Sequence, residues 1–222
     1  MYRQIILQPE QELYITSDSH YHHLNICKAT TTWKNSDDVT RKFDSIDEMN
    51  NTIVNSINSV VNQDDILIHL GDWSFNGFDN IKLFRNYINC RTIYIIPGNH
   101  DHHILKNKNN IQDIFTEIYP QITVLNIKRK LTDSKSGMYK KYNLVLSHYP
   151  QCSWIDMNQG YYHLHGHVHL PNHLKLGQGK SLDVGADGNN YIPYSLTEID
   201  NLLSNQPIKK LSLPSDHHEK RL

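Results

Sequence analysis

Oxygen- and nitrogen-bearing side chains follow five apolar runs of the sequence, at the point where each run ends. The five segments are "SDSH" (17–20), "GDW" (71–73), "GNHD" (98–101), "SHYP" (147–150) and "GHVH" (166–169). Carboxylate, amide and imidazole groups without thiolates suit Mn, Fe, Zn or Ni better than Ca or Mg. Sites in α/β proteins form outside the carboxyl ends of the strands. We therefore expect a metal site at one end of a sheet, where Gly71, Gly98 and Gly166 let the backbone approach closely.

The apolar runs before these segments have the length and the branched residues of buried strands. Seven such runs are present, at 13–16, 66–70, 92–97, 122–127, 142–148, 161–166 and 181–185. Residues 45–61 predict a helix, because apolar side chains recur at helical spacing and Ser45 and Glu48 form a capping-box pattern. A second helix is predicted over 80–88.

This order of elements predicts an α/β fold, with two packed β-sheets and helices outside. The first half alternates strand and helix, which is the order of right-handed βαβ units. The second half is strand-rich, and a hairpin turn near Ser136 and Gly137 would join the strands at 122–127 and 142–147. No repeat or linker divides the chain, so we expect one domain over 1–206 and a polar C-terminal tail over 207–222.

The composition limits the classes of function that fit. The chain has 222 residues, 38% of them hydrophobic, which suffices for the core of one large domain. Its 22 basic and 23 acidic residues give a formal net charge of −1. That balance gives no electrostatic basis for a dedicated nucleic-acid or membrane-surface binder. No apolar run approaches the roughly 20 residues of a membrane span, and the N-terminal run is too short for a signal peptide.

The cysteines indicate a reducing compartment. Cys27, Cys90 and Cys152 are widely spaced and form no CxxC pair, so neither thiolate-bound zinc nor a disulfide framework is expected. Abundant Asn, Ile and Lys are associated with AT-rich bacterial or viral genomes. We expect a cytoplasmic protein of a bacterium, or of the host cell if the chain is viral.

The five segments, taken in order, resemble the signature of the calcineurin-like metallophosphoesterases, D-x-H … G-D … G-N-H-D/E … H … G-H-x-H. The resemblance spans residues 13–169. The segments "TSDSHYHHLNI" (16–26) and "DVGADGNNYIPYSLTEI" (183–199) are similar to a subgroup of small, single-domain members of bacterial or phage type. The family fold is a two-sheet β-sandwich flanked by α-helices, which agrees with the elements predicted above.

The resemblance implies a metal-dependent phosphoesterase with two divalent metal ions, manganese first, with iron, zinc or nickel as alternatives. It implies that one metal is held by Asp18, His20, Asp72 and His169, and the other by Asp72, Asn99, His148 and His167, so that Asp72 bridges the pair. Two cations about 3.5–4 Å apart can clamp a phosphoryl group and generate hydroxide near neutral pH. His100 would protonate the leaving oxygen or stabilise the transition state, with Asp101 fixing its loop or its imidazole.

Histidine occupies every second position from 163 to 169. His167 and His169 flank Val168, so in an extended strand they would point the same way, toward the two adjacent metals. His165 precedes the glycine turn and is expected in the core or behind the ligands. His163 is expected to be an ordinary strand residue.

Other polar residues near the segments admit two interpretations. His23 could contact the substrate phosphate or serve local packing, and the sequence does not separate the two. His102 and His103 are expected to begin the next helix rather than to line the site. The basic run at 128–130 is expected to be a solvated face.

An active enzyme fits the segments better than the alternatives. A catalytically inactive binding module of the same fold should lack some ligands or the acid histidine, and a metal store would not need His100. No arginine follows "GNHD" before Arg129, so no arginine fork for a phosphomonoester dianion is evident. We expect a small phosphodiester: a cyclic nucleotide, a nucleotide or a short nucleic-acid end. The alternative is a phosphomonoesterase acting on nucleotides or proteins. No membrane and no obligate protein partner are expected.

Overall fold

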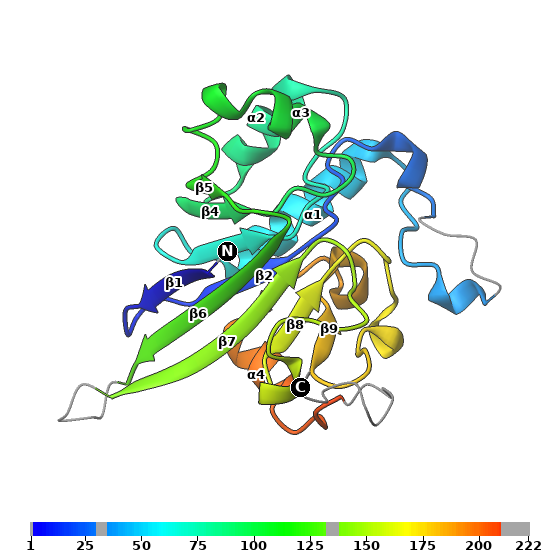
Figure 1. Cartoon of the computed structure of the whole chain (residues 1–222). Helices are drawn as coiled ribbons and strands as arrows, with labels where there is room; N and C mark the ends of the chain where they lie inside the picture. Colours follow the sequence, from blue (N-terminus) through cyan, green and yellow to red (C-terminus); the bar gives the residue numbers. More distant parts are fainter. Residues whose placement is uncertain (1, 30–34, 132–137, 210–222) are drawn as a thin grey trace, which may run out of the picture.

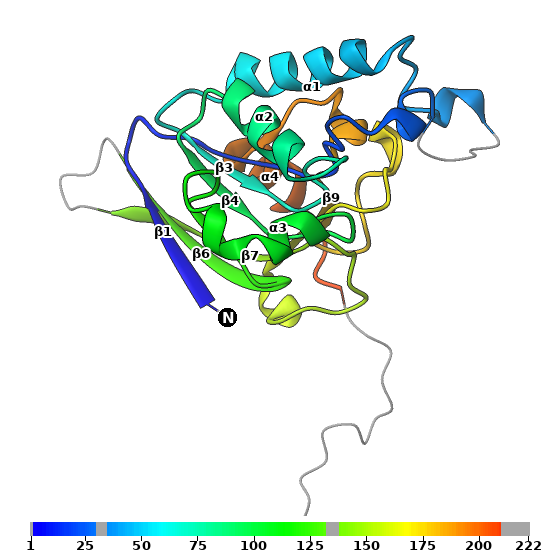
Figure 2. The same ribbon diagram turned by 90° about the horizontal axis from the view of Figure 1, so that it is seen from above.

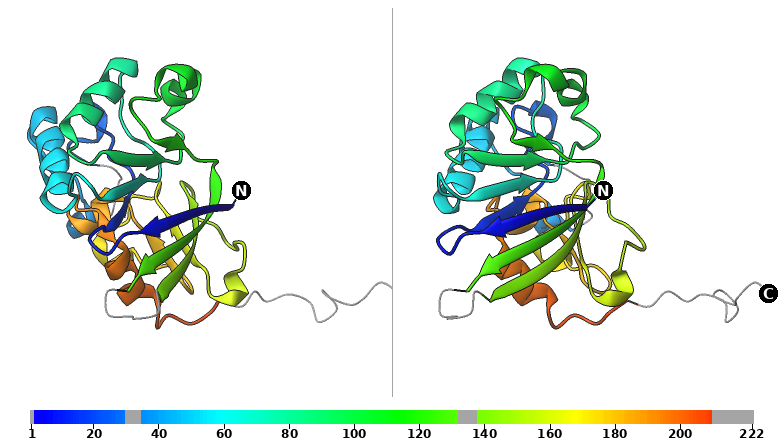
Figure 3. Two further views of the ribbon diagram at one scale, coloured as in Figure 1. Left: turned by 90° about the vertical axis from the view of Figure 1, so that its left-hand side faces the viewer. Right: turned by 60° about the vertical axis from the view of Figure 1, so that its left-hand side comes forward.

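Two five-stranded sheets stack face to face in the computed structural model, which describes residues 2–29, 35–131 and 138–209 (Figures 1 and 3). The strand order is β1-β6-β7-β8-β9 in one sheet and β10-β2-β3-β4-β5 in the other. Helices flank the pair of sheets. The predicted α/β architecture of two packed sheets with helices outside is thereby confirmed.

The first sheet contains the long hairpin that the sequence predicts. Its strands are β1 (Tyr2–Leu7), β6 (Ile122–Lys130), β7 (Tyr139–Ser147), β8 (Tyr162–His165) and β9 (Ser181–Asp183). β6 and β7 pair antiparallel, from Ile122 opposite Ser147 to Lys130 opposite Tyr139, whereas the other neighbours are parallel. The expected turn at Ser136 and Gly137 lies outside the described residues.

The second sheet brings three of the five polar segments to one edge. It contains β2 (Leu13–Thr16), β3 (Ile66–His69), β4 (Thr92–Ile95) and β5 (Glu117–Ile118) in parallel, with β10 (Tyr194–Ser195) antiparallel to β2. Parallel neighbours end at the same edge of a sheet. The segments at 17–20, 71–73 and 98–101, which follow β2, β3 and β4, therefore emerge side by side.

Three helices cover the outer face of the second sheet (Figures 1 and 2). They are α1 (Ile46–Val60), α2 (Phe78–Tyr87) and α3 (His102–Lys106), and a fourth helix, α4 (Leu196–Leu203), contacts β2, β9 and β10. Successive side chains of β3 point to opposite faces of the sheet and so belong to two different hydrophobic clusters. Ile66 and Ile68 face the apolar layer between the sheets, whereas Leu67 packs with the helices.

The start of α1 shows how the local sequence sets a boundary. The Ser45 hydroxyl accepts a hydrogen bond from the Glu48 N–H (3.1 Å), as the capping pattern predicts. The Glu48 carboxylate accepts from the N–H of Asp44 (2.8 Å), one residue before the position it takes in a capping box. α3 begins at His102, as expected, and α2 begins at Phe78, two residues before the predicted start.

Within the described ranges, no helix combines the length and the apolar character needed to cross a bilayer.

Candidate metal centre

The polar segments converge into two groups of potential metal ligands. The first group is Asp18, His20 and His169, and the second group is Asp72, His148 and His167. Within each group, one ligand atom from every residue lies within 4.8 Å of the others. The first two ligands of the first group come from the turn after β2, and His169 comes from the segment after β8.

Asp72 lies between the two groups. Its Oδ2 is 3.4 Å from Nε2 of His20, in the first group, and 3.5 Å from Nε2 of His148, in the second group. Its other oxygen, Oδ1, accepts a hydrogen bond from the backbone N–H of His100 (2.9 Å). One carboxylate oxygen is thus placed where it could serve two cations at once.

Two buried polar atoms of the first group fit a cation. Asp18 Oδ1 and His20 Nε2 are buried and have no hydrogen-bond partner, which is costly for groups withdrawn from water. Burial raises the pKa of Asp18 to about 6 and lowers the pKa of His20 well below its usual value. A divalent cation would offer both atoms a partner and would favour the ionised carboxylate and the neutral imidazole. The donor set therefore fits a divalent metal ion.

Five of these residues adopt a left-handed backbone. Their φ angles are +58° at Asp18, +48° at His20, +55° at Asp72, +72° at His167 and +54° at His169. This conformation costs a non-glycine residue about 1–3 kcal/mol and tends to persist at functional sites. The strain indicates that these turns are shaped for the site rather than for the stability of the chain.

The backbone corrects the expected reason for the arrangement of His167 and His169. β8 ends at His165, so the two residues do not share a strand face. Each instead leaves a turn with positive φ, and His167 enters the second group while His169 enters the first. The two imidazoles do reach two adjacent groups, but the glycine turn and the left-handed residues aim them, rather than the pleat of a strand.

Close backbone packing explains the glycines of the segments. A Cβ on Gly166 would lie 2.1 Å from Ser17 Oγ and 2.3 Å from Asp18 Oδ2, and one on Gly98 would lie 2.3 Å from Asp72 Oδ1. Gly71 has a φ of +105°. The ligand carboxylates pack directly on glycine backbone, where no side chain fits.

Asp101 holds two of the ligand turns together. One of its carboxylate oxygens accepts from the N–H groups of Asp72 (2.7 Å) and Gly98 (2.8 Å), and the other accepts from the N–H of Trp73 (3.0 Å). Burial raises the pKa of Asp101 to about 6. Of the two actions expected for Asp101, these bonds correspond to fixing the loop that carries His100.

The second group is more open than the first. His148 Nδ1 lies 2.8 Å from the carbonyl oxygen of Leu70, and His148 Nε2 lies 2.9 Å from Oδ1 of Asn99, the additional ligand expected there. Asn99 and His167 are exposed. The Tyr149 ring lies 4.6 Å from the His167 ring and is 45% exposed. No sequence signal singled out Tyr149.

His23 and Phe75 form an aromatic stack beside His100. The rings of His23 and Phe75 lie 3.5 Å apart and are nearly parallel, and the His100 ring lies 4.9 Å from Phe75. His23 Nδ1 lies 3.4 Å from His20 Nδ1. Burial, followed by the nearby His100, lowers the pKa of His23 to about 4. These contacts serve packing, and a contact between His23 and substrate stays a prediction.

A buried ion pair, missed in the sequence, lies behind the first group. Asp187 Oδ2 is 2.7 Å from His169 Nδ1, and the Asp187 carboxylate pairs with the guanidinium of Arg41. Asp187 belongs to "DVGADGNN" (183–190), a segment whose only signal in the sequence is its resemblance to small family members. Nothing in "TRKF" marks Arg41 as part of a site.

The remaining candidate histidines lie outside the two groups. His163 is buried against Trp154, and its Nε2 accepts from the N–H of Gln151 (3.0 Å). His165 is also buried, and its ring lies 5.2 Å from that of His163. His163 is a strand residue, as expected, and lies in the core, and His165 has the core position that was one of the two roles expected for it.

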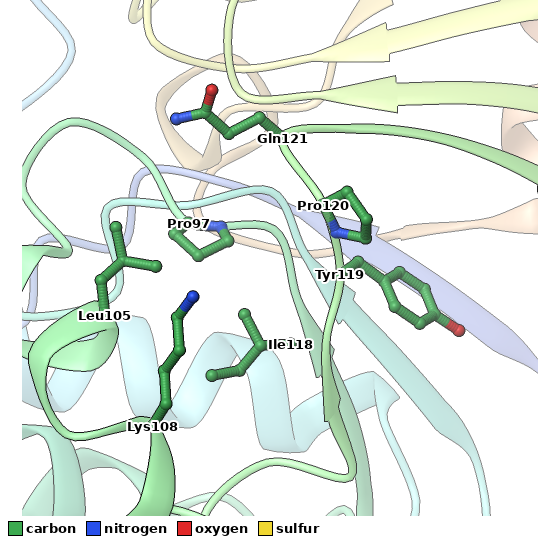
Figure 4. Close-up of a pocket in the computed structure, with 7 residues that line it drawn as sticks. All are labelled: Pro97, Leu105, Lys108, Ile118, Tyr119, Pro120 and Gln121. Atoms are coloured by element: carbon green, nitrogen blue, oxygen red, sulfur yellow. The ribbon is translucent and has the colours of Figure 1, made fainter. Parts of the chain in front are cut away.

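A cavity of about 410 Å³ lies next to the loop that carries His100 (Figure 4). It is lined by Pro97, Leu105, Lys108, Ile118, Tyr119, Pro120 and Gln121. Pro97 directly precedes Gly98, but no residue of the two ligand groups lines the cavity. The metal ligands therefore do not belong to this cavity.

Comparison with known proteins agrees with this site. Over residues 12–218 the chain matches the family model of the calcineurin-like phosphoesterases. It is 28% identical over 200 residues to an uncharacterized protein of Methanocaldococcus jannaschii, covering 87% of this chain and 92% of that protein. The crystal structure of a protein of unknown function from Aquifex aeolicus has the same fold, with a TM-score of 0.57 and 21% identity over 87% of this chain and all of that chain. The family match spans nearly the whole chain and includes both ligand groups, so the protein belongs to the calcineurin-like phosphoesterase family.

Proposed function

We propose that the protein hydrolyses small phosphodiesters at a centre of two divalent metal ions. The observation that carries this proposal is the place of Asp72, whose single Oδ2 faces a histidine of each ligand group. A shared carboxylate oxygen is what two closely spaced cations require. His100 lies directly beside it, because its N–H is bonded to the other oxygen of Asp72.

Each residue of the centre has a distinct task in this proposal. Asp18, His20 and His169 hold one cation and Asp72, Asn99, His148 and His167 hold the other, with Asp72 shared. When bound, the two cations hold phosphoryl oxygens and make water nucleophilic near neutral pH. Mn²⁺ is the first choice for nitrogen and oxygen donors without thiolate, and Fe, Zn and Ni are alternatives.

His100 is proposed to protonate the leaving oxygen. The backbone N–H of His100 donates to Asp72. The Asp101 carboxylate accepts from the backbone N–H groups of Asp72 and Gly98. The backbone of His100 is therefore held next to the shared carboxylate, and its ring lies 5.4 Å from the ring of His20. A residue that binds no metal and sits beside the reacting phosphate is placed for general acid catalysis.

The partners of the arginines support a diester over a monoester. A monoester is largely a dianion at pH 7, and sites for dianions often add a guanidinium fork to the metals. Arg41 is the arginine next to the ligand turns, and all its N–H groups are used within the protein. The other arginines of the described ranges donate to protein groups as well: Arg3 to Glu117, Arg85 to backbone carbonyls, Arg91 to Asp64 and Arg129 to Glu12.

Aromatic rings on both sides of the ligands also support a diester. The stack of His23 and Phe75 lies beside His100, and the exposed ring of Tyr149 lies beside His167. A diester carries two organic groups on one phosphate. We propose that the leaving group faces the His100 side and that the retained group faces Tyr149, which suits planar groups such as nucleobases.

The test compares a diester with its matched monoester. We expect kcat/KM for bis(p-nitrophenyl) phosphate to exceed that for p-nitrophenyl phosphate, with saturating Mn²⁺ at one pH. The Asp72→Asn variant, purified in parallel, should lose both activities, which separates this site from a contaminating phosphatase. A tenfold or larger preference for the monoester would contradict the diester proposal and favour a phosphomonoesterase. A panel of 2′,3′- and 3′,5′-cyclic nucleotides, dinucleotides and single-stranded nucleic acid would then identify the natural class.

A further inference from the structure

Arg41 and Asp187 form an ion pair that solvent does not reach. Both side chains have no exposed surface. Arg41 Nε lies 3.0 Å from Asp187 Oδ1, and Nη2 lies 3.0 Å from Oδ2, so the contact is bidentate. Thr40 adds a hydroxyl hydrogen bond to Oδ1 (2.6 Å). Such an enclosed pair cannot touch a substrate, so its effect on the site must pass through the residues it contacts.

The pair fixes the orientation of His169. Oδ2 of Asp187 lies 2.7 Å from His169 Nδ1. A carboxylate only accepts, so Nδ1 carries the proton and Nε2 is the ring nitrogen left for a cation. The bidentate contact places the permanent positive charge of Arg41 against both oxygens of Asp187. Arg41 thereby keeps the acceptor ionised in a buried place.

The same guanidinium holds the other two ligands of the first group through their backbone. Nη2 donates to the carbonyl oxygen of Asp18, and Nη1 donates to that of Ser19 (3.1 Å), the residue before His20. These two peptides carry the left-handed turns at Asp18 and His20. The Arg41 side chain therefore helps to position three potential ligands from two distant segments, two through their backbone and His169 through Asp187.

Among the described residues, no further carboxylate backs a histidine of the second group, where Asp101 holds only backbone groups, those of Asp72 and Gly98 among them. His148 Nδ1 faces the carbonyl oxygen of Leu70, which is uncharged, and His167 is exposed. Carboxylate-backed histidines are more basic ligands and are held in one orientation, and loss of the backing group typically costs 10- to 100-fold in metal affinity. The two halves of the centre therefore differ in preorganisation.

We infer that Arg41 and Asp187 are positioning residues that make the first group the tighter of two unequal metal sites. This inference rests on the proposed dinuclear centre. The first group fills before the second when metal is limiting. The second group exchanges its metal more readily.

Equilibrium binding of Mn²⁺ to the full chain tests this inference. Binding is measured by dialysis against graded free Mn²⁺, with electron paramagnetic resonance separating isolated from coupled ions. The wild type should bind two Mn²⁺ with unequal affinities. Asp187→Asn should weaken the tighter site by about 10- to 100-fold and change the other by less than threefold. Arg41→Lys keeps the charge but not the fork, so it should also weaken the tighter site.

Two controls separate positioning from a general structural effect. Glu117→Gln removes the acceptor of another ion pair, with Arg3 on β1, and should change neither affinity. Asp187→Asn introduced into a His169→Ala background should add less than a threefold further loss, because the Asp187 effect passes through His169. A similar loss with and without His169, or equal weakening of both sites, would overturn the inference.

A measurement on the wild type keeps the inference testable if the variants do not fold. Long-range ¹H–¹⁵N correlation on the Zn²⁺-loaded protein should show His169 protonated at Nδ1, and protonation at Nε2 would overturn the inference. If the wild type does not bind two metal ions, both the proposed function and this inference are wrong. If it binds two and Asp187→Asn binds both equally well, the inference alone fails.

Discussion

At the scale of single residues, the centre holds its acids and bases in states that favour cations. Burial raises the pKa of Asp18 and lowers that of His20, and each side chain keeps one buried polar atom without a hydrogen-bond partner. Without a cation, burying these two atoms unpartnered destabilises the fold. Their burial makes sense when a divalent ion supplies the missing partner.

His100 gives the first residue-scale prediction. His100→Asn should keep both metals and lower kcat by roughly 10²- to 10⁴-fold, the range for a positioned general acid. Poor leaving groups need the proton more than good ones do. The loss should therefore be smaller for nitrophenyl esters than for alkyl esters with the same metal loading. Equal losses across leaving groups would show that His100 acts electrostatically and not as an acid.

The sequence predicted the ligand residues because their type and position carry the signal. The expected residues at five strand ends come together in space, and His163 is a strand residue outside both groups, as predicted. The sequence could not predict the role of Arg41. A buried arginine is recognised by its partners, and the oxygen atoms that accept from Arg41 belong to residues 22 to 146 positions away in the chain. Asp187 carried no signal of its own, because Asp183, Asn189 and Asn190 make the same segment polar.

At the scale of elements, the turns rather than the strands position the chemistry. β2, β3 and β8 bring their ends together, but the ligands lie beyond those ends, on left-handed residues packed against glycine. This explains why strand alternation gave the wrong reason for the placement of His167 and His169 in two adjacent groups. The period of two holds only while the strand lasts, and β8 stops at His165.

Gly166 gives the element-scale prediction. A methyl group there would meet Ser17 and Asp18 well inside contact distance, so Gly166→Ala should lower the free energy of unfolding by about 1–3 kcal/mol and weaken metal binding to the first group. Gly77→Ala is the matched control. Its φ of +99° makes alanine unfavourable by a similar amount, but nothing lies within 4 Å of its Cβ position. Metal affinity and the urea midpoint are measured for both, and equal metal affinities in the two variants would contradict the prediction.

Most of the elements that the sequence did not predict are short or lie at the edge of a sheet. The sequence did not predict β1, β5, β10 or α4. β5 and β10 have two residues each, too few for a periodic pattern. β1 is an edge strand in which Tyr2, Gln4 and Ile6 are exposed, so its apolar pattern is incomplete. The central strands were predicted because burial on both faces leaves a continuous apolar run.

At the scale of the whole molecule, buried neutral histidines link stability to pH. Burial, with the neighbouring His165, lowers the pKa of His163 to about 4 in the fold, against about 6.5 in the unfolded chain. The depressed pKa means that the neutral form stabilises the fold above pH 6.5. That contribution is lost as the pH falls toward 4, because the unfolded state binds the proton first.

The His163→Gln variant tests this linkage. Glutamine keeps a donor and an acceptor but does not titrate. Between pH 7 and pH 5, the metal-free wild type should lose about 2 kcal/mol more unfolding free energy than the variant. Urea unfolding in the presence of a chelator measures both. Parallel pH profiles would show that His163 titrates alike in the folded and unfolded states.

The proposed metal centre depends on Asp72 as the anion shared by two cations. The most direct test is the number of Mn²⁺ ions bound per chain at saturation, measured by elemental analysis for the wild type and for Asp72→Asn, with circular dichroism confirming that both are folded. We expect two ions in the wild type, and weaker binding of both with no detectable hydrolysis in the variant, because the shared carboxylate loses its charge. A single ion in the wild type, or a folded Asp72→Asn that keeps two tightly bound ions and normal rates, would contradict this expectation.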